Sequence, residues 1–316
     1  MKRKLVVGTR GSELALVQTR WVIEGLRERF PALEFEERVI KTRGDMILDV
    51  SLDKVGGKGL FVKEIEKALL EGEIDLAVHS MKDLPTELPD GLVIGAVCER
   101  EDPRDAFVSA DGRGFAELKP GARIGTSSLR RGAQLKHARP DLEIVPIRGN
   151  VDTRLAKVRS EGLAGAVLAV AGLERLGRAH EITERLDLSL CLPAVGQGAI
   201  GVEVREDDDL VREVVGALDH RETRLAVAAE RAFMRRLEGG CHVPVAALAR
   251  AEGEALVLEG LVAAVDGSAV VRGEKRADLS PDGAAQVGVE LAEELLAMGG
   301  EMILARLAAA PGRNAD

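Results

Sequence analysis

Apolar and polar residues alternate along the first two-thirds of the chain in two recurring patterns. Short runs rich in Val, Ile and Leu, such as KLVVGT and IDLAVHS, predict buried strands. Between such runs lie longer stretches with helical spacing of apolar residues. One of them, SELALVQTRWVIEGLRERF, begins at Ser12, which suits a helix N-cap, and ends before Pro31. Strands that alternate with helices predict βαβ units around a largely parallel sheet.

The same alternation resumes after a charged segment and predicts a second α/β block. The segment EREDPRDAFVSADG is rich in charge and is interrupted by Pro103, so we predict a crossing between domains there. Beyond it, three stretches each predict a strand, a loop and a helix: ARIGTSSLRRGAQLKHARP, LEIVPIRGNVDTRLAKVRSEG and GAVLAVAGLERLG. The stretch LPAVGQGAIGVEVRED predicts a return strand that either closes the second block or rejoins the first sheet.

From about residue 217 the pattern changes to that of a small α+β domain. The stretch RETRLAVAAERAFMRRLEGG predicts a helix. Three alternating stretches, VPVAALARAE, ALVLEGLVAAVDG and AVVRGEKRADL, predict antiparallel strands joined by hairpins. A last helix is expected from about residue 281 to residue 299.

Composition and charge restrict the class of protein. A chain of 316 residues with 46% hydrophobic and 31% charged residues is typical of a soluble globular protein. A net charge of −9 argues against a general nucleic-acid binder. No apolar run approaches the ~20 residues that span a bilayer, and the N-terminal run is too short for a signal peptide, so we expect a cytoplasmic protein without a membrane partner. The cysteines, Cys98, Cys191 and Cys241, suit free thiols better than a disulfide framework or a zinc site, and we expect no metal.

One segment reverses the acidic balance of the chain. Residues 119–140 contain no acidic residue, and GTSSLRRG places Arg130 and Arg131 in the first turn of a helix capped by Ser127 or Ser128. Backbone N–H groups, hydroxyls and guanidinium groups at a helix start favour an anion, whereas a solvated basic helix is the ordinary alternative. Similar turns in GTRGSELA and RGNVDTRL predict one ligand with several phosphates or carboxylates at the C-terminal strand ends. The residues of these turns are Arg10, Ser12, Thr126, Arg148, Gly149, Asn150 and Arg154.

Two further segments carry candidate catalytic groups. GGKGLFVKE lacks the Ser or Thr that follows the lysine of a phosphate-binding P-loop. We still expect Lys58 to lie on a mobile loop that faces the ligand, and a flexible surface turn is the alternative. AVHSMKDLP places Lys82 and Asp83 directly after an apolar strand, where a carboxylate can hold charge or exchange protons. A surface Lys–Asp pair is the alternative here, but among arginines Asp83 is the natural counter-ion for a cationic intermediate.

The segment GGCHVP leaves three interpretations open for Cys241. A buried structural thiol belongs in an apolar run, which this segment is not. A nucleophile needs a base in space, and His242 is poorly placed because neighbouring side chains diverge. The third interpretation is an exposed thiol that holds a group covalently.

Taken together, these segments resemble the porphobilinogen deaminase family from end to end. Eight motifs occur in the family's order and spacing: GTRGSELA, GGKGLFVKE, DLAVHSMKDLP, GTSSLRR, RGNVDTRL, AVAGLERLG, PAVGQGA and GGCHVP. The resemblance implies two α/β domains similar to the lobes of periplasmic binding proteins, and a small C-terminal α+β domain with a three-stranded antiparallel sheet. The expected boundaries are residues 1–98 with 199–216, residues 99–198, and residues 217–316.

The resemblance also implies an activity. Enzymes of this family are transferases that join four porphobilinogen molecules head to tail, release ammonia and yield 1-hydroxymethylbilane for tetrapyrrole (haem) biosynthesis. Their primer is a dipyrromethane, which the resemblance attaches to Cys241 through a thioether. It further implies a monomer whose product passes to uroporphyrinogen-III synthase. A non-catalytic, two-lobed binding protein for anions or polycarboxylates is the alternative, but it leaves Asp83 and Cys241 without a role.

Roles for individual residues follow from the resemblance. Each pyrrole carries carboxylates, which the arginines are expected to bind, and Asp83 is expected to contact pyrrole N–H groups and stabilise positive charge. His242 and Glu13 depart from the family's pattern without displacing a catalytic residue. The expected catalytic residues are Arg10, Lys58, Lys82 and Asp83. The cofactor is expected on Cys241, Asp83, Lys82, Ser12, Thr126, Ser127, Ser128, Arg130, Arg131, Arg148, Gly149 and Arg154, and the substrate on Arg10, Ser12, Arg148, Arg154, Arg175 and Gln197.

Overall fold

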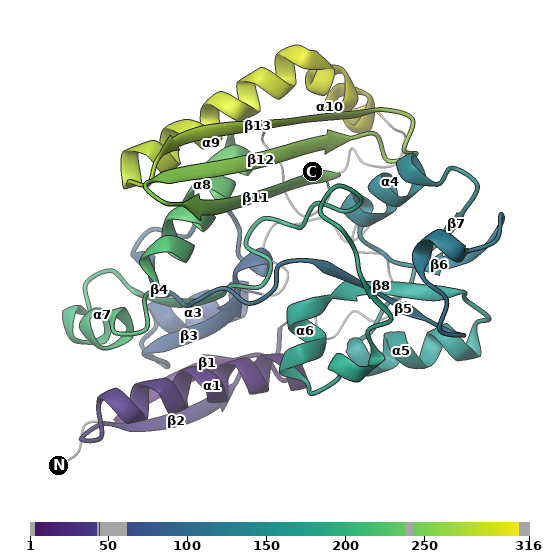
Figure 1. Ribbon diagram of the computed structural model, residues 1–316. Helices are drawn as coiled ribbons and strands as arrows, with labels where there is room; N and C mark the ends of the chain where they lie inside the picture. The colour runs from purple at the N-terminus through teal and green to yellow at the C-terminus, as the bar shows by residue number, and fades with distance from the viewer. Residues whose placement is uncertain (1–3, 43, 45–61, 238–242, 310–316) are drawn as a thin grey trace. The chain divides into compact units, whose positions relative to one another are not determined.

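A computed structural model describes residues 4–42, 44, 62–237 and 243–309 (Figure 1). Two of the predicted site residues, Lys58 and Cys241, lie outside these described residues. The chain divides into two compact units. The first unit comprises residues 1–49, 57–101 and 199–224, and the second comprises residues 50–56, 102–198 and 225–316.

The first unit is built on a five-stranded sheet in the order β2-β1-β3-β10-β4. Strand β1 runs parallel to β2 and β3, whereas β10 runs antiparallel to both of its neighbours, β3 and β4. The return strand therefore rejoins the first sheet, which settles the choice that the sequence left open. The elements of this unit are β1 (Lys4–Thr9), α1 (Glu13–Arg29), β2 (Glu34–Val39), α3 (Lys63–Leu70), β3 (Leu76–Ser80), the 3-10 turn η1 (Met81–Asp83), β4 (Leu92–Val97), β10 (Ile200–Arg205) and α7 (Asp209–Gly216).

Helices cover both faces of this sheet. On one face α1 packs its buried side chains, among them Val22 and Leu26, into a core that includes Val78. On the other face α3 packs Ile65 and its apolar neighbours against Ala77. Because side chains alternate along a strand, the residues that follow in β3 also point to opposite faces.

The second unit contains another five-stranded sheet, in the order β7-β6-β8-β5-β9. Strand β6 runs parallel to β7 and β8, and β5 is antiparallel to β8 and β9. The strand β5 was not predicted from the sequence, because its first residue is a charged Asp105 and the segment before it is rich in charge. The elements are β5 (Asp105–Ser109), η2 (Phe115–Glu117), β6 (Arg123–Gly125), α4 (Leu129–Ala138), β7 (Glu143–Val145), α5 (Val151–Ser160), β8 (Gly165–Ala169), α6 (Val170–Arg175), η3 (Ala179–Glu181) and β9 (Glu184–Arg185).

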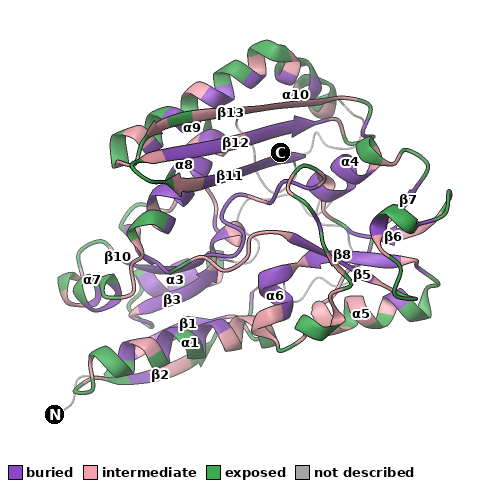
Figure 2. Ribbon diagram, in the orientation of Figure 1, coloured by how far each residue is buried: buried purple, intermediate pink, exposed green. Residues whose placement is uncertain are grey.

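The three C-terminal strands form an antiparallel sheet, β11-β12-β13, as the alternating pattern predicts. Helices α8 and α9 cover one of its faces with a core that includes Phe233 and Leu291, and β12 is almost wholly buried (Figure 2). Its other face contacts α4 through a cluster that includes Ala133 and Leu261. The remaining elements are α8 (Arg221–Arg236), β11 (Val245–Glu252), β12 (Ala255–Ala263), β13 (Val270–Asp278), α9 (Pro281–Leu295), the π-helical turn η4 (Leu296–Gly300) and α10 (Glu301–Ala308).

The predicted fold class is confirmed: two α/β sheets precede a three-stranded antiparallel sheet covered by helices. The last helix differs from its prediction, because α9 ends at Leu295 and a second helix, α10, follows. The break lies at Gly299, whose φ of 114° is one that glycine adopts readily and other residues avoid. In the described part of the chain, no helix combines the length and the apolar character needed to cross a membrane.

Candidate functional site

Arg10 and Asp83 lie together at one edge of the first sheet. Arg10 follows β1 directly, and Asp83 ends the turn η1 that follows β3. Because β1 and β3 are parallel neighbours, their carboxyl ends share this edge, and Arg10 Nη1 lies 3.9 Å from Asp83 Oδ2. The Asp83 side chain is 39% exposed, so this long contact leaves its oxygens accessible to a ligand.

A small pocket of about 50 Å³ lies beside this pair, lined in part by Ser12, Gln18 and Ser80. Ser12 caps α1 as predicted, since its Oγ accepts a hydrogen bond from a backbone N–H of the first turn. Gln18 Nε2 donates to Ser80 Oγ over 2.9 Å, and Gln18 is only 3% exposed. Gln18 was not predicted as a site residue, because a single polar residue within a helix belongs to no recognisable motif. Lys82 is half-buried in the same turn as Asp83.

In the second unit, β6, β7 and β8 end at a common edge because they are parallel. Ser128 caps α4, which confirms one of the two predicted caps. The other candidate, Ser127, donates through Oγ to the carbonyl oxygen of Ile147 over 2.7 Å, and so joins the loops after β6 and β7. Thr126 Oγ1 accepts a hydrogen bond from the backbone N–H of Ser128. These hydroxyls therefore shape the two loops that form the edge.

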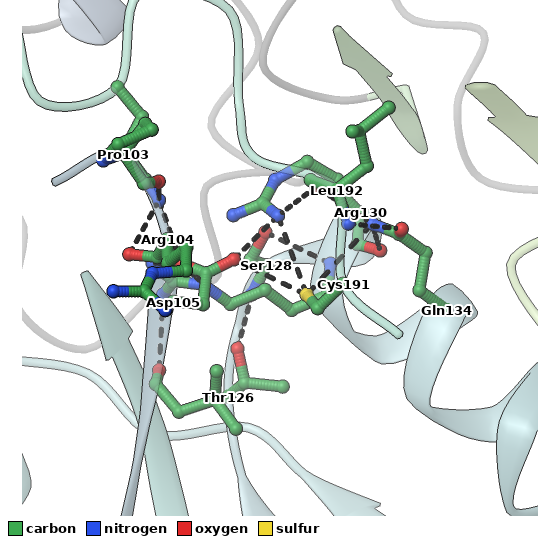
Figure 3. A network of polar contacts seen from close by, with 12 residues as sticks. Pro103, Arg104, Asp105, Thr126, Ser128, Arg130, Gln134, Cys191 and Leu192 are labelled. Atoms are coloured by element: carbon green, nitrogen blue, oxygen red, sulfur yellow. Dashed lines mark hydrogen bonds and ion pairs between the residues drawn. The ribbon is translucent and has the colours of Figure 1, made fainter. Parts of the chain in front are cut away.

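The arginine pair of α4 is buried and held by Asp105, the first residue of β5 (Figure 3). Arg130 and Arg131 are 5% and 6% exposed, and Asp105 is fully buried. Arg131 donates through Nε and Nη2 to one carboxylate oxygen, while Arg130 Nη1 donates to the other over 2.7 Å. The sequence places both arginines correctly in the first helical turn, but it does not predict Asp105 as their partner. The charged motif DPRDAF was the sequence signal that could have indicated a role for Asp105.

The charge state of this cluster is fixed by its arginines. Burial alone would raise the pKa of Asp105, but Arg130 and Arg131 outweigh it, and the pKa lies far below its usual range. Cys191 Sγ donates to Asp105 over 3.3 Å, and burial together with this carboxylate raises the pKa of the Cys191 thiol to about 12. Cys191 is therefore a neutral structural thiol, which excludes it as a nucleophile at neutral pH.

The loop after β7 presents a second group of donors. Asn150 caps α5, as predicted, and Arg154 Nε donates to the carbonyl oxygen of Gly149 over 2.9 Å. Gly149 has a φ of 112°, and a Cβ at this position would lie 2.6 Å from Thr153, so only glycine fits. Arg148 Nη1 is buried and has no hydrogen-bond partner among the described residues. A buried donor in this state favours an added anionic ligand.

The two remaining predicted substrate residues also lie in the second unit. Arg175, the last residue of α6, donates through Nη2 to the carbonyl oxygen of Gly198 over 2.7 Å. Gln197 is 1% exposed and donates through Nε2 to Asp105 Oδ1 over 2.9 Å. Gln197 therefore belongs to the Asp105 cluster.

The structure thus brings the predicted residues into two groups, one in each unit. The first group combines a carboxylate with cations at a sheet edge, and the second combines arginines with helix N-termini. In the part of the chain that the structure describes, no set of three metal-ligating side chains could hold an ion. The first group contains Arg10, Ser12, Lys82 and Asp83, and the second contains Thr126, Ser127, Ser128, Arg130, Arg131, Arg148, Gly149, Arg154, Arg175 and Gln197.

Comparison with known proteins identifies the family of the chain over nearly its whole length. Residues 5–213 match the family model described as porphobilinogen deaminase, dipyromethane cofactor binding domain, and residues 224–297 match that of the porphobilinogen deaminase C-terminal domain. The chain is 57% identical to the porphobilinogen deaminase of Pelotomaculum thermopropionicum, with 97% of each chain covered. It is 56% identical to that of Desulforudis audaxviator, with 98% of this chain and 99% of the other covered. Among solved structures, the methionine-binding protein MetQ aligns with 68% of this chain and 89% of its own at 15% identity and a TM-score of 0.45.

Proposed function

The chain belongs to the porphobilinogen deaminase family, and from this premise we propose which of its residues carry out each part of the reaction. The chain is a transferase that condenses four porphobilinogen molecules head to tail, with release of ammonia, to give 1-hydroxymethylbilane. The match over both family domains is the observation that carries this function, and it favours the enzyme over a non-catalytic anion-binding protein.

The residues of the second unit fit a dipyrromethane cofactor. Such a cofactor carries several carboxylates, and Arg148 Nη1 is a buried donor with no partner among the described residues. The N-termini of α4 and α5 add backbone N–H groups at the same sheet edge. When bound, the dipyrromethane supplies the nucleophilic pyrrole carbon that receives the first substrate unit. We assign its covalent attachment to Cys241, which lies outside the described residues, and its carboxylates to Arg148, Arg154 and the two helix N-termini.

Asp83 is the residue that we assign to the chemical step. Its partly exposed carboxylate can accept hydrogen bonds from the pyrrole N–H of the incoming porphobilinogen. Positive charge develops on that nitrogen as bonds form and ammonia leaves, and a nearby carboxylate stabilises it. The same oxygens can pass a proton toward the departing amine or accept one from the ring carbon.

Arg10 and Lys82 hold the substrate's carboxylates beside Asp83. Arg10 is already within 3.9 Å of Asp83 Oδ2, and its planar guanidinium can bind a carboxylate with two hydrogen bonds. Lys82 lies next to Asp83 in η1 and supplies a point charge. Lys58, outside the described residues, remains a predicted third cation for this site.

Arg130 and Arg131 act on a ligand through their charge rather than through direct hydrogen bonds. Both are buried on Asp105, so their charge reaches a ligand at the start of α4 mainly as a field rather than as exposed donors. Gln197, on the same carboxylate, contributes to this arrangement.

We propose that the enzyme works as a monomer in the cytoplasm and passes its product to uroporphyrinogen-III synthase. An open-chain hydroxymethyl product is reactive, which favours direct use by a ring-closing enzyme. Sedimentation velocity of the purified enzyme tests the monomeric state. A main boundary with the mass of a dimer would contradict it.

Intact-mass measurement tests the cofactor assignment. Protein from cells that make porphobilinogen should exceed its sequence mass by one dipyrromethane, and Cys241→Ser should lack this increment and the activity. Cys98→Ala is the matched control, because Cys98 is buried in the core of the first unit, and it should keep the increment. A Cys241→Ser protein that retains the added mass would contradict the assignment of Cys241 as the attachment site. Wild-type protein that does not turn over porphobilinogen would contradict the proposed function.

A further inference from the structure

Three titratable side chains that the proposed reaction does not use lie buried together in the first unit. They are Glu66 on α3, His79 on β3 and Glu203 on β10, with exposed fractions of 6%, 5% and 0%. His79 Nε2 lies 3.0 Å from Glu203 Oε2. We refer to these three residues as the buried triad.

The strand register places the triad on the face of the sheet that α3 covers. In the antiparallel pair of β3 and β10, His79 stands opposite Gly201 and Glu203 opposite Ala77. Ala77 packs against α3, so His79 and Glu203 point toward the same helix, which carries the buried Glu66.

The triad lies directly beneath the turn that carries Asp83. Gly201, opposite His79, leaves room for Met81, because a Cβ on Gly201 would lie 2.3 Å from Met81 Sδ. Met81 is 1% exposed and is the first residue of η1, whose last residue is Asp83. Its backbone N–H donates to the carbonyl oxygen of Ala199 over 3.0 Å, just before β10. The strand pair that holds the triad therefore also fixes the start of the Asp83 turn.

The triad keeps an excess negative charge as long as both of its carboxyl groups are ionised. Two carboxylates and one imidazole leave at least one excess negative charge when both acids are ionised. Glu66 Oε1 and Glu203 Oε1 are each buried with no hydrogen-bond partner in the described part of the chain. An unpaired buried charge is costly, so a proton held on the triad stabilises the folded state.

The surroundings of Glu66 support a proton held there. Burial and the neighbouring Glu203 raise the pKa of Glu66 to about 7, while His79 and Lys63 act in the opposite direction. His79 and Glu203 face Glu66 from the sheet, and Lys63 acts from α3 itself. Strand β4, on the other side of β10, contributes no titratable residue, since its sequence is LVIGAV.

We propose that the buried triad is a positioning device for Asp83, in which a proton shared among Glu66, His79 and Glu203 ties α3 to the strands β3 and β10 and holds the Asp83 turn. Of the three residues, His79 borders the pocket beside Asp83 with a side chain that is 2% exposed, and the two glutamates do not border it, so the triad acts through the turn. The idea rests on the proposed function of Asp83.

Nuclear magnetic resonance of the holoenzyme with 13C-labelled glutamate carboxyl groups tests the shared proton without reference to activity. Glu66→Gln assigns the Glu66 signal, which should titrate near pH 7 in the wild type. Glu203→Gln removes the neighbouring negative charge, so Glu66 should release its proton at a pH lower by about half a unit or more than in the wild type. The control Glu71→Gln removes an exposed carboxylate of the same region and should leave the midpoint unchanged. An unchanged midpoint in Glu203→Gln overturns the shared proton.

Kinetics of cofactor-loaded variants tests the positioning role. His79→Leu should lower kcat for porphobilinogen about 10- to 100-fold with KM within about twofold, because a small displacement of Asp83 affects the transition state more than binding. His79→Gln should recover part of this loss, since its amide N–H can still donate to Glu203. Normal kcat in both variants overturns positioning, and so does a His79→Gln that is as slow as a folded His79→Leu. If His79→Leu does not fold, a His79→Gln with unchanged kcat and an unchanged pH profile is the result that overturns the proposal. If the wild type itself fails to turn over porphobilinogen, the proposed function fails, whereas the titration of Glu66 still reports on the triad.

Discussion

Arg131 places two N–H groups on a single oxygen of Asp105, with Nε at 2.9 Å and Nη2 at 2.7 Å from Oδ1. Arg130 occupies the other oxygen at 2.7 Å, so one buried carboxylate holds both guanidinium groups of α4. Pairing and hydrogen bonding offset the cost of burying these charges, and removal of one partner leaves the others uncompensated. The helix that forms part of the predicted cofactor edge is thus anchored to β5 by charge.

Asp105→Asn tests this anchor, because it keeps the size of the side chain and removes its charge. We expect the free energy of unfolding in urea to fall by about 3 kcal/mol. The matched control is Asp102→Asn, whose partly exposed pairs with Arg104 and Arg185 should contribute less than about 1 kcal/mol. The folded pKa of Asp105 lies below its ordinary value, so its contribution is present above about pH 4 and is lost as pH falls further. A variant as stable as the wild type at pH 7 would contradict the anchor.

Asp83→Asn tests the catalytic carboxylate. Its side chain is 39% exposed and its contact with Arg10 is long, so we expect the unfolding midpoint to change little. The kcat for ammonia release from porphobilinogen should fall by a factor of about 100 or more, because an amide cannot stabilise the cationic nitrogen or carry the proton. Asp90→Asn, an exposed aspartate on the chain that follows, is the control and should leave kcat unchanged. Near-normal turnover in Asp83→Asn would remove Asp83 from the chemical step.

Arg148→Gln tests whether the buried Nη1 group of Arg148 binds carboxylates. The substitution removes a buried N–H group that lacks a partner among the described residues, so we expect no loss of thermal stability in protein that lacks the cofactor. The KM for porphobilinogen should rise by about tenfold, or the fraction of protein that carries the cofactor should fall by about tenfold. Either change corresponds to the loss of a charged hydrogen bond. Arg159→Gln, which changes an exposed arginine on the helix α5 that follows Arg148, should match the wild type in both measurements. Unchanged KM and cofactor content in Arg148→Gln would show that this side chain has a structural role alone.

The pH dependence of stability tests the raised pKa of Glu66. Its folded pKa of about 7 exceeds the ordinary value of 4.5, so the folded state binds the proton more tightly than the unfolded state. The stability that this proton contributes is complete below about pH 4.5 and is lost as pH rises to 7. Glu66→Gln does not lose it, and its Tm relative to the wild type should increase by about 5 °C between pH 5 and pH 8. The Tm difference of Glu71→Gln should stay flat over this range, and a flat difference in Glu66→Gln would contradict the raised pKa.

Local features of the fold were predictable because their interactions lie close in sequence. The caps Ser12, Ser128 and Asn150 each bond to a backbone N–H three residues on, and the pattern of side chains revealed them. The three C-terminal strands were predictable for the same reason, since short turns connect them. The strand β5 was missed, because the charge of Asp105 is compensated by residues 25 and 26 positions away.

The sequence by itself determined the alternation of strands and helices, the positions of the helix caps and, through eight ordered motifs, the family. These follow from backbone hydrogen bonding and side-chain spacing over a few residues. Only the tertiary structure decided that β10 rejoins the first sheet, that Arg130 and Arg131 point to Asp105, and that Glu66, His79 and Glu203 share one buried space. A buried charge is stable only beside its partner, and here the partners come from strands and helices that are far apart in the chain. Their proximity is a property of the packed fold, which no local pattern records.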